Sequence, residues 1–349
     1  MARDHGAVIG WDVGGVNTKA AIVVGAPGSP IAPRAVSVPY EIQREPSALV
    51  ATLRRLANEL GAGGGERHAV TMTAELSQLF RTKREGVRFV LDAFDAAFEG
   101  EQIQVYTVNG AFISPEEARR RPLEVAASNW AATAMLVSRF ERNAILIDTG
   151  TTTTDIIPIE DGCVVAVGRT DPERLVTGEL VYTGAVRTPA EALVADVRLP
   201  GGTAGVSAEG FALIGDALLW LGRLHETDYA APTPDGRPAE REFAGERLAR
   251  FVCADREILD ASAIDAIALE LAEAQIGRIV AGIDRVRSRR PAIGRAVVTG
   301  LGDFVAAEAA RRAGLSVVAL SDRLGSAART APAAAVAWLL ADAVAGPPA

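Results

Sequence analysis

Short apolar runs of strand length alternate with stretches of helical spacing through the first part of the chain. Leu49, Val50, Leu53, Leu56 and Leu60 recur at the three- and four-residue intervals of an amphipathic helix. Three strands, then helix, strand, helix, strand and helix, is the order of one α/β lobe. The pattern predicts strands at 9–13, 20–24, 35–38, 68–77 (running into a turn) and 103–108, and helices at 46–60, 82–98 and 115–140, the last with a break near Pro122.

The second part of the chain restarts the same order and then interrupts it. An irregular stretch contains an apolar helix at 210–221 and a loop at 225–242 rich in proline, glycine and acids. We predict a first lobe over residues 1–141, a second lobe over 142–349, and an insertion at about 185–261 that forms a cap or an oligomer contact. The regular elements predicted for the second lobe are strands at 145–148, 154–157, 163–167, 296–298 and 316–320, a helix at 262–287, and an Ala-rich final helix.

Length, composition and charge narrow the function classes. A chain of 349 residues, about half of them apolar, is long enough for two domains with substantial cores. The net charge of −8 argues against nucleic acid as the main partner, since binding to a phosphate backbone needs a clustered positive surface. Cys163, Cys253, His5, His68 and His225 are scattered, so neither a disulfide framework nor a zinc site is indicated. No segment has the length of a membrane span or the apolar core of a signal peptide, so we expect a cytoplasmic protein that does not act on membranes.

The first candidate site is a hairpin in which an apolar strand ends in Asp12 and turns through Gly14 and Gly15. The two glycines allow positive φ and leave no Cβ between backbone amides and a phosphate oxygen. Asp12 would hold a divalent cation, directly or through water. An ordinary Gly-Gly hairpin with a strand-end acid is the alternative. The side chains after the turn that would donate to phosphate are Asn17, Thr18 and Lys19.

A second hairpin at residues 145–157 repeats this layout of strand, acid, glycine turn, hydroxyl residues and strand. Two such hairpins half a chain apart suggest duplicated lobes that face each other across a cleft, with a polyanion and its metal between them. Aligning Asp12 with Asp148 also pairs Gly14 with Gly150, Thr18 with Thr154, and Lys19 with Asp155.

A third glycine turn, with Gly300 and Gly302, follows a strand and precedes a helix. Amides at a helix N-terminus bind anions, so this turn would hold a nucleotide or another ligand. A tight strand-to-helix turn that binds nothing is the alternative.

The motifs Asp-x-Gly-Gly, Asp-x-Gly-Thr-Thr and Thr-Gly-Leu-Gly, in this order and each at a strand end, resemble those of the actin, heat-shock ATPase and sugar kinase superfamily. DVGGVNTK and DTGTTTTDIIP are most similar to its hydantoinase and oxoprolinase branch. Together with MTAELS, RLVTGELVYTGAVRTP and TPDGR, they resemble the synthase family of methanofuran biosynthesis. In methylotrophic bacteria this family is assigned to a tetrahydromethanopterin-linked one-carbon pathway. The resemblance covers nearly the whole chain.

The resemblance implies a two-lobed, actin-like ATPase fold of the ribonuclease H-like class. It also implies a transferase that joins an aminomethylfuran-methyl diphosphate to the phenol of a glutamylated tyramine or a tyrosine derivative. The product is an aryl ether, and pyrophosphate leaves. The expected partners are therefore these small-molecule substrates, with a homo-oligomer as a possibility. Mg²⁺ is the expected cofactor, and no ATP need be spent although the fold usually binds it.

That chemistry assigns roles to the hairpin residues. A primary carbon attached to furan ionises readily because the ring oxygen spreads the positive charge, so the enzyme's main task is to stabilise the departing diphosphate. Lys19 would neutralise charge on this leaving group. The metal would be held by Asp12 and Asp148, with Asp155 as the next candidate, and the phosphates would be bound by Gly14, Gly15, Asn17, Thr18, Thr149, Gly150, Thr151, Thr152 and Thr153.

A phenol has a pKa of about 10, so a nearby carboxylate would accept its proton as the ether forms. Glu75 and Glu179 are the candidate bases, with a capping or salt-bridged structural acid as the alternative for each. The remaining candidate substrate contacts are Asn109, Asn129, Asp235 and Arg237, for which helix surface, capping and a solvated loop are the alternatives.

Two other functions stay open on the sequence. The fold more often supports an ATP-dependent kinase or hydrolase, which would use Gly300 and Gly302 for adenosine. A non-catalytic nucleotide-binding regulatory protein is the second alternative. The presence of the acids and hydroxyls in both hairpins favours catalysis, or at least metal-phosphate binding, over a scaffold.

Overall fold

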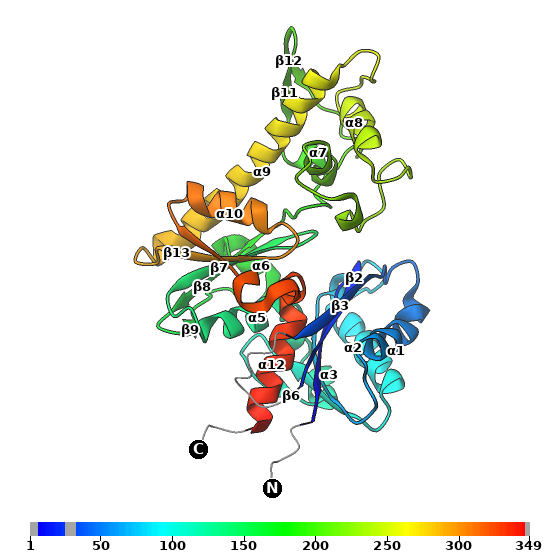
Figure 1. Ribbon diagram of the computed structural model, residues 1–349, viewed down its shortest axis with the longest axis vertical. Helices are drawn as coiled ribbons and strands as arrows, with labels where there is room; N and C mark the ends of the chain where they lie inside the picture. The colour runs from blue at the N-terminus through cyan, green and yellow to red at the C-terminus, as the bar shows by residue number, and fades with distance from the viewer. Residues whose placement is uncertain (1–5, 25–32, 346–349) are drawn as a thin grey trace. The chain divides into compact units, whose positions relative to one another are not determined.

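The computed structural model describes residues 6–24 and 33–345 (Figure 1). His5 and the rest of the N-terminal segment 1–5 considered above lie outside the described residues. Within the described ranges no helix is both long and apolar enough to cross a membrane.

The first sheet has the strand order β3-β2-β1-β4-β5-β6. β1 pairs antiparallel with β2 and parallel with β4, which in turn pairs parallel with β5. All six residues of β1 are buried, as expected for a central parallel strand. The carboxyl ends of β1, β4 and β5 therefore meet at one edge of the sheet. The strands are β1 (Val8–Val13), β2 (Asn17–Val23), β3 (Arg34–Pro39), β4 (Arg67–Met72), β5 (Gln102–Tyr106) and β6 (Phe112–Ile113).

Helices from both ends of the chain cover this sheet. α12 (Ala331–Ala345) packs on β1, β2 and β4, and it comes so close that a Cβ at Gly10 would collide with Ala333 and Ala337. On the chain's first part, α1 packs against α2, and α2 against α4. These helices are α1 (Leu49–Glu59), preceded by a 3₁₀ turn at Pro46–Ala48, α2 (Lys83–Ala97), α3 (Pro115–Arg120), α4 (Pro122–Val125) and α5 (Asn129–Ser138).

The helix predicted over 115–140, with a break near Pro122, is three short helices in the structure. Arg121, which precedes Pro122, has φ −120° and ψ 55°, in line with the steric exclusion of helical conformation before proline. The second helix ends at Val125, because Ala126 is extended with a ψ of 130°, and Ala127 then adopts a positive φ of 51°. The predicted break near Pro122 is confirmed, and the break before Asn129 has no glycine or proline to signal it.

The second sheet repeats the order of the first, with β10-β8-β7-β13-β14 along its path and β9 paired to β8. β7 and β8 form the second hairpin, as β1 and β2 form the first. The elements are β7 (Ala144–Thr149), β8 (Thr154–Glu160), β9 (Cys163–Val164), β10 (Leu180–Val181), β13 (Arg295–Thr299) and β14 (Ser316–Ala319), with α6 (Asp171–Thr177), α9 (Ala261–Arg289), α10 (Asp303–Arg312) and α11 (Ser321–Leu324).

The stretch predicted as an insertion forms a small group of elements of its own. It has a two-stranded sheet of β11 (Asp196–Leu199) and β12 (Gly202–Gly205), followed by α7 (Ile214–Trp220) and α8 (Arg241–Arg250). α7 and α8 pack against each other and against the long helix α9 (Figure 1). α8 begins inside the segment predicted as loop. The sequence shows little sign of this helix, because most of its residues are polar and its buried apolar face consists mainly of Ala244, Leu248 and Ala249.

The chain divides into two compact units. The first comprises the described residues up to Leu146, Ile157–Arg174 and those from Val318 on; the second comprises Ile147–Ile156 and Leu175–Val317. Each unit contains the glycine turn of one hairpin, with Gly14 and Gly15 in the first unit and Gly150 in the second. The predicted lobe boundary at residues 141 and 142 stays a prediction.

Candidate functional site

The first hairpin places a lysine on a buried carboxylate. Asp12 of β1 and Lys19 of β2 are cross-strand partners, and Nζ of Lys19 donates to Oδ2 of Asp12 at 3.2 Å. Asp12 is only 4% exposed, and its Oδ1 is buried with no hydrogen-bond partner among the described residues. The hairpin thus has a carboxylate oxygen that a cation, a water or a ligand donor would satisfy.

The turn of this hairpin explains why it needs a glycine. The amide of Gly14 donates to the carbonyl of Asn17 at 2.9 Å, and a Cβ at Gly14 would lie 2.8 Å from that oxygen. At Gly15 a Cβ would meet no atom of the described residues within 4 Å, so this side of the residue has room for a ligand, although its carbonyl accepts from the amide of Ile42. Neither residue is among the glycines with positive φ. The expected left-handed conformation is therefore wrong, and close backbone contact is the reason for glycine at Gly14.

The second hairpin has the same turn geometry within its own unit. The amide of Gly150 donates to the carbonyl of Thr153 at 2.9 Å, which matches the bond between Gly14 and Asn17. Thr18 and Thr154 occupy equivalent positions after the turns, and both are fully buried. The Thr154 hydroxyl donates to the carbonyl of Thr183 at 2.7 Å. The layout repeat seen in the sequence is therefore a repeat of the turn hydrogen bond, whereas the hydroxyl of Thr18, unlike that of Thr154, has no partner among the described residues.

A segment after β10 packs directly on the second turn, and sequence reasoning did not place it there. The amide of Ala185 donates to the carbonyl of Gly150 at 2.8 Å, and the amides of Val186 and Arg187 donate to the carbonyl of Thr151. A Cβ at Gly184 would lie 2.5 Å from the Thr152 nitrogen. The second turn is therefore fixed by backbone contacts from this segment.

Gln275, which is fully buried on α9, forms hydrogen bonds with this segment after β10. Its Nε2 donates to Oγ1 of Thr183 at 3.0 Å and to the carbonyl of Gly184 at 2.7 Å. A lone glutamine inside a long helix carries no signal in the sequence, because its partners lie more than ninety residues away.

The third glycine turn contacts the second hairpin. The amide of Gly302 donates to the carbonyl of Thr149 at 2.8 Å, so this amide is not available to a nucleotide. Gly300 has a φ of +93°, and a Cβ there would collide with Oδ1 of Asp148 and the carbonyl of Thr149. Asp148 is 9% exposed and Asp155, on β8, is 6% exposed. The structure thus brings the predicted residues Asp148, Thr149, Gly300 and Gly302 together.

Glu75 lies just beyond the carboxyl end of β4 with its side chain fully buried. Nζ of Lys83 is 3.5 Å from Oε1 of Glu75 and 2.8 Å from Oδ2 of Asp171. Burial raises the pKa of Glu75 to about 7, although the charge of Lys83 opposes the rise. A carboxyl with a pKa near neutrality is suited to general base catalysis.

The other candidate base is already engaged. Glu179 is fully buried, accepts a hydrogen bond from Oγ1 of Thr177 at 3.0 Å and lies 3.5 Å from Nη2 of Arg289. Asn109 is exposed in the turn after β5, and Asn129 is the half-buried first residue of α5. These positions agree with the predicted local structure of both asparagines.

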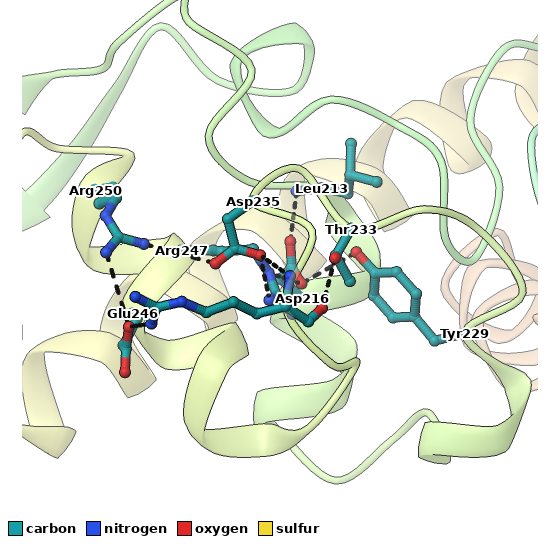
Figure 2. A network of polar contacts seen from close by, with 9 residues as sticks. Leu213, Asp216, Tyr229, Thr233, Asp235, Glu246, Arg247 and Arg250 are labelled. Carbon is teal, nitrogen blue, oxygen red and sulfur yellow. Dashed lines mark hydrogen bonds and ion pairs between the residues drawn. The ribbon is translucent and has the colours of Figure 1, made fainter.

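Asp235 and Arg237 belong to an ion-pair network within the predicted insertion. Figure 2 shows Asp235 in this network together with Asp216, Glu246 and Arg247. Oδ1 of Asp235 lies 3.1 Å from Nη1 of Arg247, whose Nε donates to Oδ1 of the buried Asp216 at 2.8 Å. Arg237 pairs with Glu246 on α8. Burial raises the pKa of Asp216, and the neighbouring Arg247 opposes this rise. The loop that carries Asp235 is therefore tied to α7 and α8, and its contact with a substrate stays a prediction.

The donors of the first hairpin fit a magnesium ion. The described part of the chain contains no group of three or more His, Cys, Asp or Glu side chains arranged for a metal. Mg²⁺ in phosphate sites uses one or two carboxylates, with substrate phosphates and water as its other ligands. The buried Oδ1 of Asp12, to which no residue in the described part of the chain donates, is such a carboxylate oxygen.

Comparison with protein families matches residues 66–343 to the model of hydantoinase/oxoprolinase. The chain belongs to this family. It is 34% identical over 335 residues to a protein of Methanocaldococcus jannaschii, a match that covers 95% of this chain and 97% of that one. That relative is named as the synthase of a furanyl methanamine bearing a (gamma-L-glutamylamino)ethyl-phenoxymethyl group. A protein of Methanococcus vannielii with the same name is 38% identical over 169 residues, covering 48% of this chain and 75% of that protein.

Among solved structures, the nucleotide-free acetone carboxylase superposes with a TM-score of 0.56 at 12% identity, covering 95% of this chain and 70% of that one. This chain therefore has the two-lobed, actin-like ATPase fold, which confirms the fold predicted from the sequence. The resemblance to the furan-amine synthases is confirmed as well.

Proposed function

We propose that this protein is an ether-forming synthase of methanofuran-type cofactor biosynthesis. The observation that carries the proposal is the similarity over 95% of the chain to a protein named for a product with a phenoxymethyl-furan linkage. Such a linkage joins a phenol oxygen to a furan-bound methylene carbon. The reaction is substitution at that carbon, with a diphosphate as the leaving group.

The first hairpin supplies what a departing diphosphate requires. As the carbon–oxygen bond breaks, negative charge grows on the diphosphate, and preorganised positive groups stabilise that charge. Lys19 is half-buried beside Asp12, so its ammonium is partly shielded from water and acts strongly on a nearby anion. The open backbone at Gly15 and the side chain of Asn17 would donate to phosphate oxygens.

A magnesium ion would be held by Asp12, through the buried oxygen to which none of the described residues donates a hydrogen bond. When bound, Mg²⁺ neutralises charge on phosphate oxygens and so favours departure of the diphosphate. In the second unit, Asp148, Asp155 and the turn Thr149–Thr153 are proposed to serve a metal-phosphate group in the same manner, held in place by the segment at 183–187.

Glu75 is the base in this proposal. It is fully buried with a pKa of about 7, so near neutral pH a large fraction is ionised while the carboxylate stays basic enough to accept the phenol proton. Glu179 is disfavoured, since Thr177 and Arg289 already engage its carboxylate.

The acceptor is a glutamylated tyramine or a tyrosine derivative. Its polar end is proposed to reach Asn109, Asn129, or the loop with Asp235 and Arg237. Both cysteines are exposed free thiols, which suits a reducing cytoplasm, and a homo-oligomer remains part of the proposal.

The test is to incubate the protein with Mg²⁺, the furan diphosphate and the phenolic acceptor, and to assay pyrophosphate and ADP separately. Pyrophosphate that appears only when both substrates are present supports the synthase. ADP formed from added ATP with an acceptor supports a kinase instead. If neither product forms, the regulatory nucleotide-binding protein gains support.

A further inference from the structure

The chain uses lysine only twice. Of its 36 lysine and arginine residues, all but Lys19 and Lys83 are arginine. Both lysines lie within ion-pair distance of a buried carboxylate in the first unit, Lys19 beside Asp12 and Lys83 beside Glu75. Lysine presents a compact charge on a flexible stem, whereas arginine needs the space of a planar fork. Lys19 and Lys83 are thus the two positions at which the chain places a compact positive charge next to a buried carboxyl group.

The structure fixes Lys83 firmly at its position. Lys83 is the first residue of α2, and Gly86, one turn later, packs so closely on Glu75 that a Cβ would lie 2.5 Å from the Glu75 Cα. Asp171 of α6 accepts from Nζ of Lys83 at 2.8 Å. Arg174 lies within ion-pair distance of Asp171, at 3.6 Å, and its guanidinium stacks on Trp130 with Cζ 4.5 Å from the ring centroid.

A buried carboxylate without compensation would stay protonated and could not act as a base. No hydrogen bond of ordinary geometry reaches either oxygen of Glu75 from the described residues. The charged groups that act on it are Lys83 from α2, which favours ionisation, and Asp171 from α6, which opposes it more weakly. Lys83 is therefore the group that makes an ionised Glu75 possible.

We propose that Lys83, held by Asp171, is a positioning residue that favours the ionised form of Glu75, the form that accepts the phenol proton. This role rests on the synthase function proposed above. In the step itself, the phenol O–H proton passes to the Glu75 carboxylate, the phenol oxygen bonds to the furan-bound methylene carbon, and the bond from that carbon to the diphosphate oxygen breaks. Lys83 touches no reacting atom and acts through the charge of Glu75.

A measurement that needs no activity tests the coupling of these two residues. Protein made with isotope-labelled lysine gives two side-chain signals by NMR, one each from Lys83 and Lys19. The Lys83 signal is expected to shift with a midpoint near neutral pH as Glu75 ionises, and this transition should vanish in Glu75→Gln. The pH dependence of the Lys19 signal should be the same in both proteins. A Lys83 signal with an unchanged transition in Glu75→Gln overturns the proposal.

The catalytic consequence is tested with two variants of Lys83. Lys83→Met removes the charge at similar length, so the acid limb of the kcat/KM profile for pyrophosphate release should move up by about one pH unit, with about tenfold loss below it. Lys83→Arg keeps the charge and should restore the wild-type midpoint at least in part. An unmoved midpoint in Lys83→Met would mean that Lys83 only joins α2 to α6, and the proposal fails. If wild-type protein releases no pyrophosphate, the synthase function fails while the NMR result still decides the coupling.

Discussion

Nζ of Lys19 donates to Oδ2 of Asp12 across the first hairpin at 3.2 Å, and the other oxygen of that carboxylate is buried and receives no hydrogen bond from residues 6–24 or 33–345. A cation and an unsatisfied acceptor thus lie side by side at the carboxyl end of β1. In the proposed reaction, this arrangement binds a leaving diphosphate together with its metal.

Lys19→Ala removes the cation from this pair. We expect kcat for pyrophosphate release to fall by about a hundredfold to a thousandfold, the size of effect seen when one preorganised donor to a developing anion is lost. Lys19→Arg, which keeps the charge, should lose less. Steady-state kinetics with both substrates, after circular dichroism has verified folding, gives the answer. Full activity in a normally folded Lys19→Ala protein would remove the leaving-group role.

Gly14→Ala and Gly15→Ala separate packing from ligand contact. At Gly14 a Cβ would lie 2.8 Å from the carbonyl of Asn17, whereas at Gly15 no atom of the part of the chain that the structure describes would lie within 4 Å of it. We expect Gly14→Ala to lower the free energy of unfolding by about 1–3 kcal/mol through overpacking. Gly15→Ala should be nearly neutral for stability and raise KM for the diphosphate. Denaturant titration and kinetics on both proteins test this, and equal stability losses would contradict it.

Glu75→Gln should change the pH dependence of stability. Because the pKa of Glu75 is raised to about 7, the folded protein keeps a proton that the unfolded chain has released above its ordinary pKa. Stability therefore falls as pH rises from the unfolded pKa toward neutrality. The variant should gain on the order of 3 kcal/mol over wild type at about pH 8 and almost nothing at about pH 4. Urea unfolding at both pH values measures the difference, and a gain independent of pH is the contrary result.

Arg247→Ala should destabilise the insertion strongly. Arg247 and Asp216 are both completely buried and joined at 2.8 Å, so loss of the arginine leaves a buried carboxylate without its charge partner. The expected cost is about 3–5 kcal/mol. Arg312→Ala, which breaks the exposed pair with Glu273, is the matched control and should cost no more than about 1 kcal/mol. Thermal or denaturant unfolding compares the two, and similar costs would show that the buried pair does not stabilise the fold.

Local patterns made the two hairpins predictable. An acid at the end of an apolar strand, followed by glycine, predicts a hairpin turn from neighbouring residues alone. Asp12, Asp148 and both turns could therefore be placed without knowledge of the fold. The positive φ predicted for Gly14 is wrong. Glycine is needed there because a Cβ would collide with the carbonyl of Asn17. The break at Ala127 also had no local signal, since alanine favours helix and its positive φ arises from the surrounding fold.

Long-range contacts account for what sequence reasoning missed. Lys83 reaches Asp171, and Gln275 reaches Gly184, over chain separations of 88 and 91 residues. No periodicity or spacing links such partners, because the fold alone brings them together. The composition did hold one clue, since Lys83 is one of only two lysines in an arginine-rich chain.

In the proposed reaction, an actin-like fold carries out substitution at carbon and not attack on phosphorus. The most direct test is to run the reaction with a heavy-oxygen label in the phenol of the acceptor and to locate the label by mass spectrometry. The account predicts that the label is retained in the aryl ether and is absent from the released pyrophosphate. A labelled phosphate ester, with no ether formed, would show attack on phosphorus and contradict it.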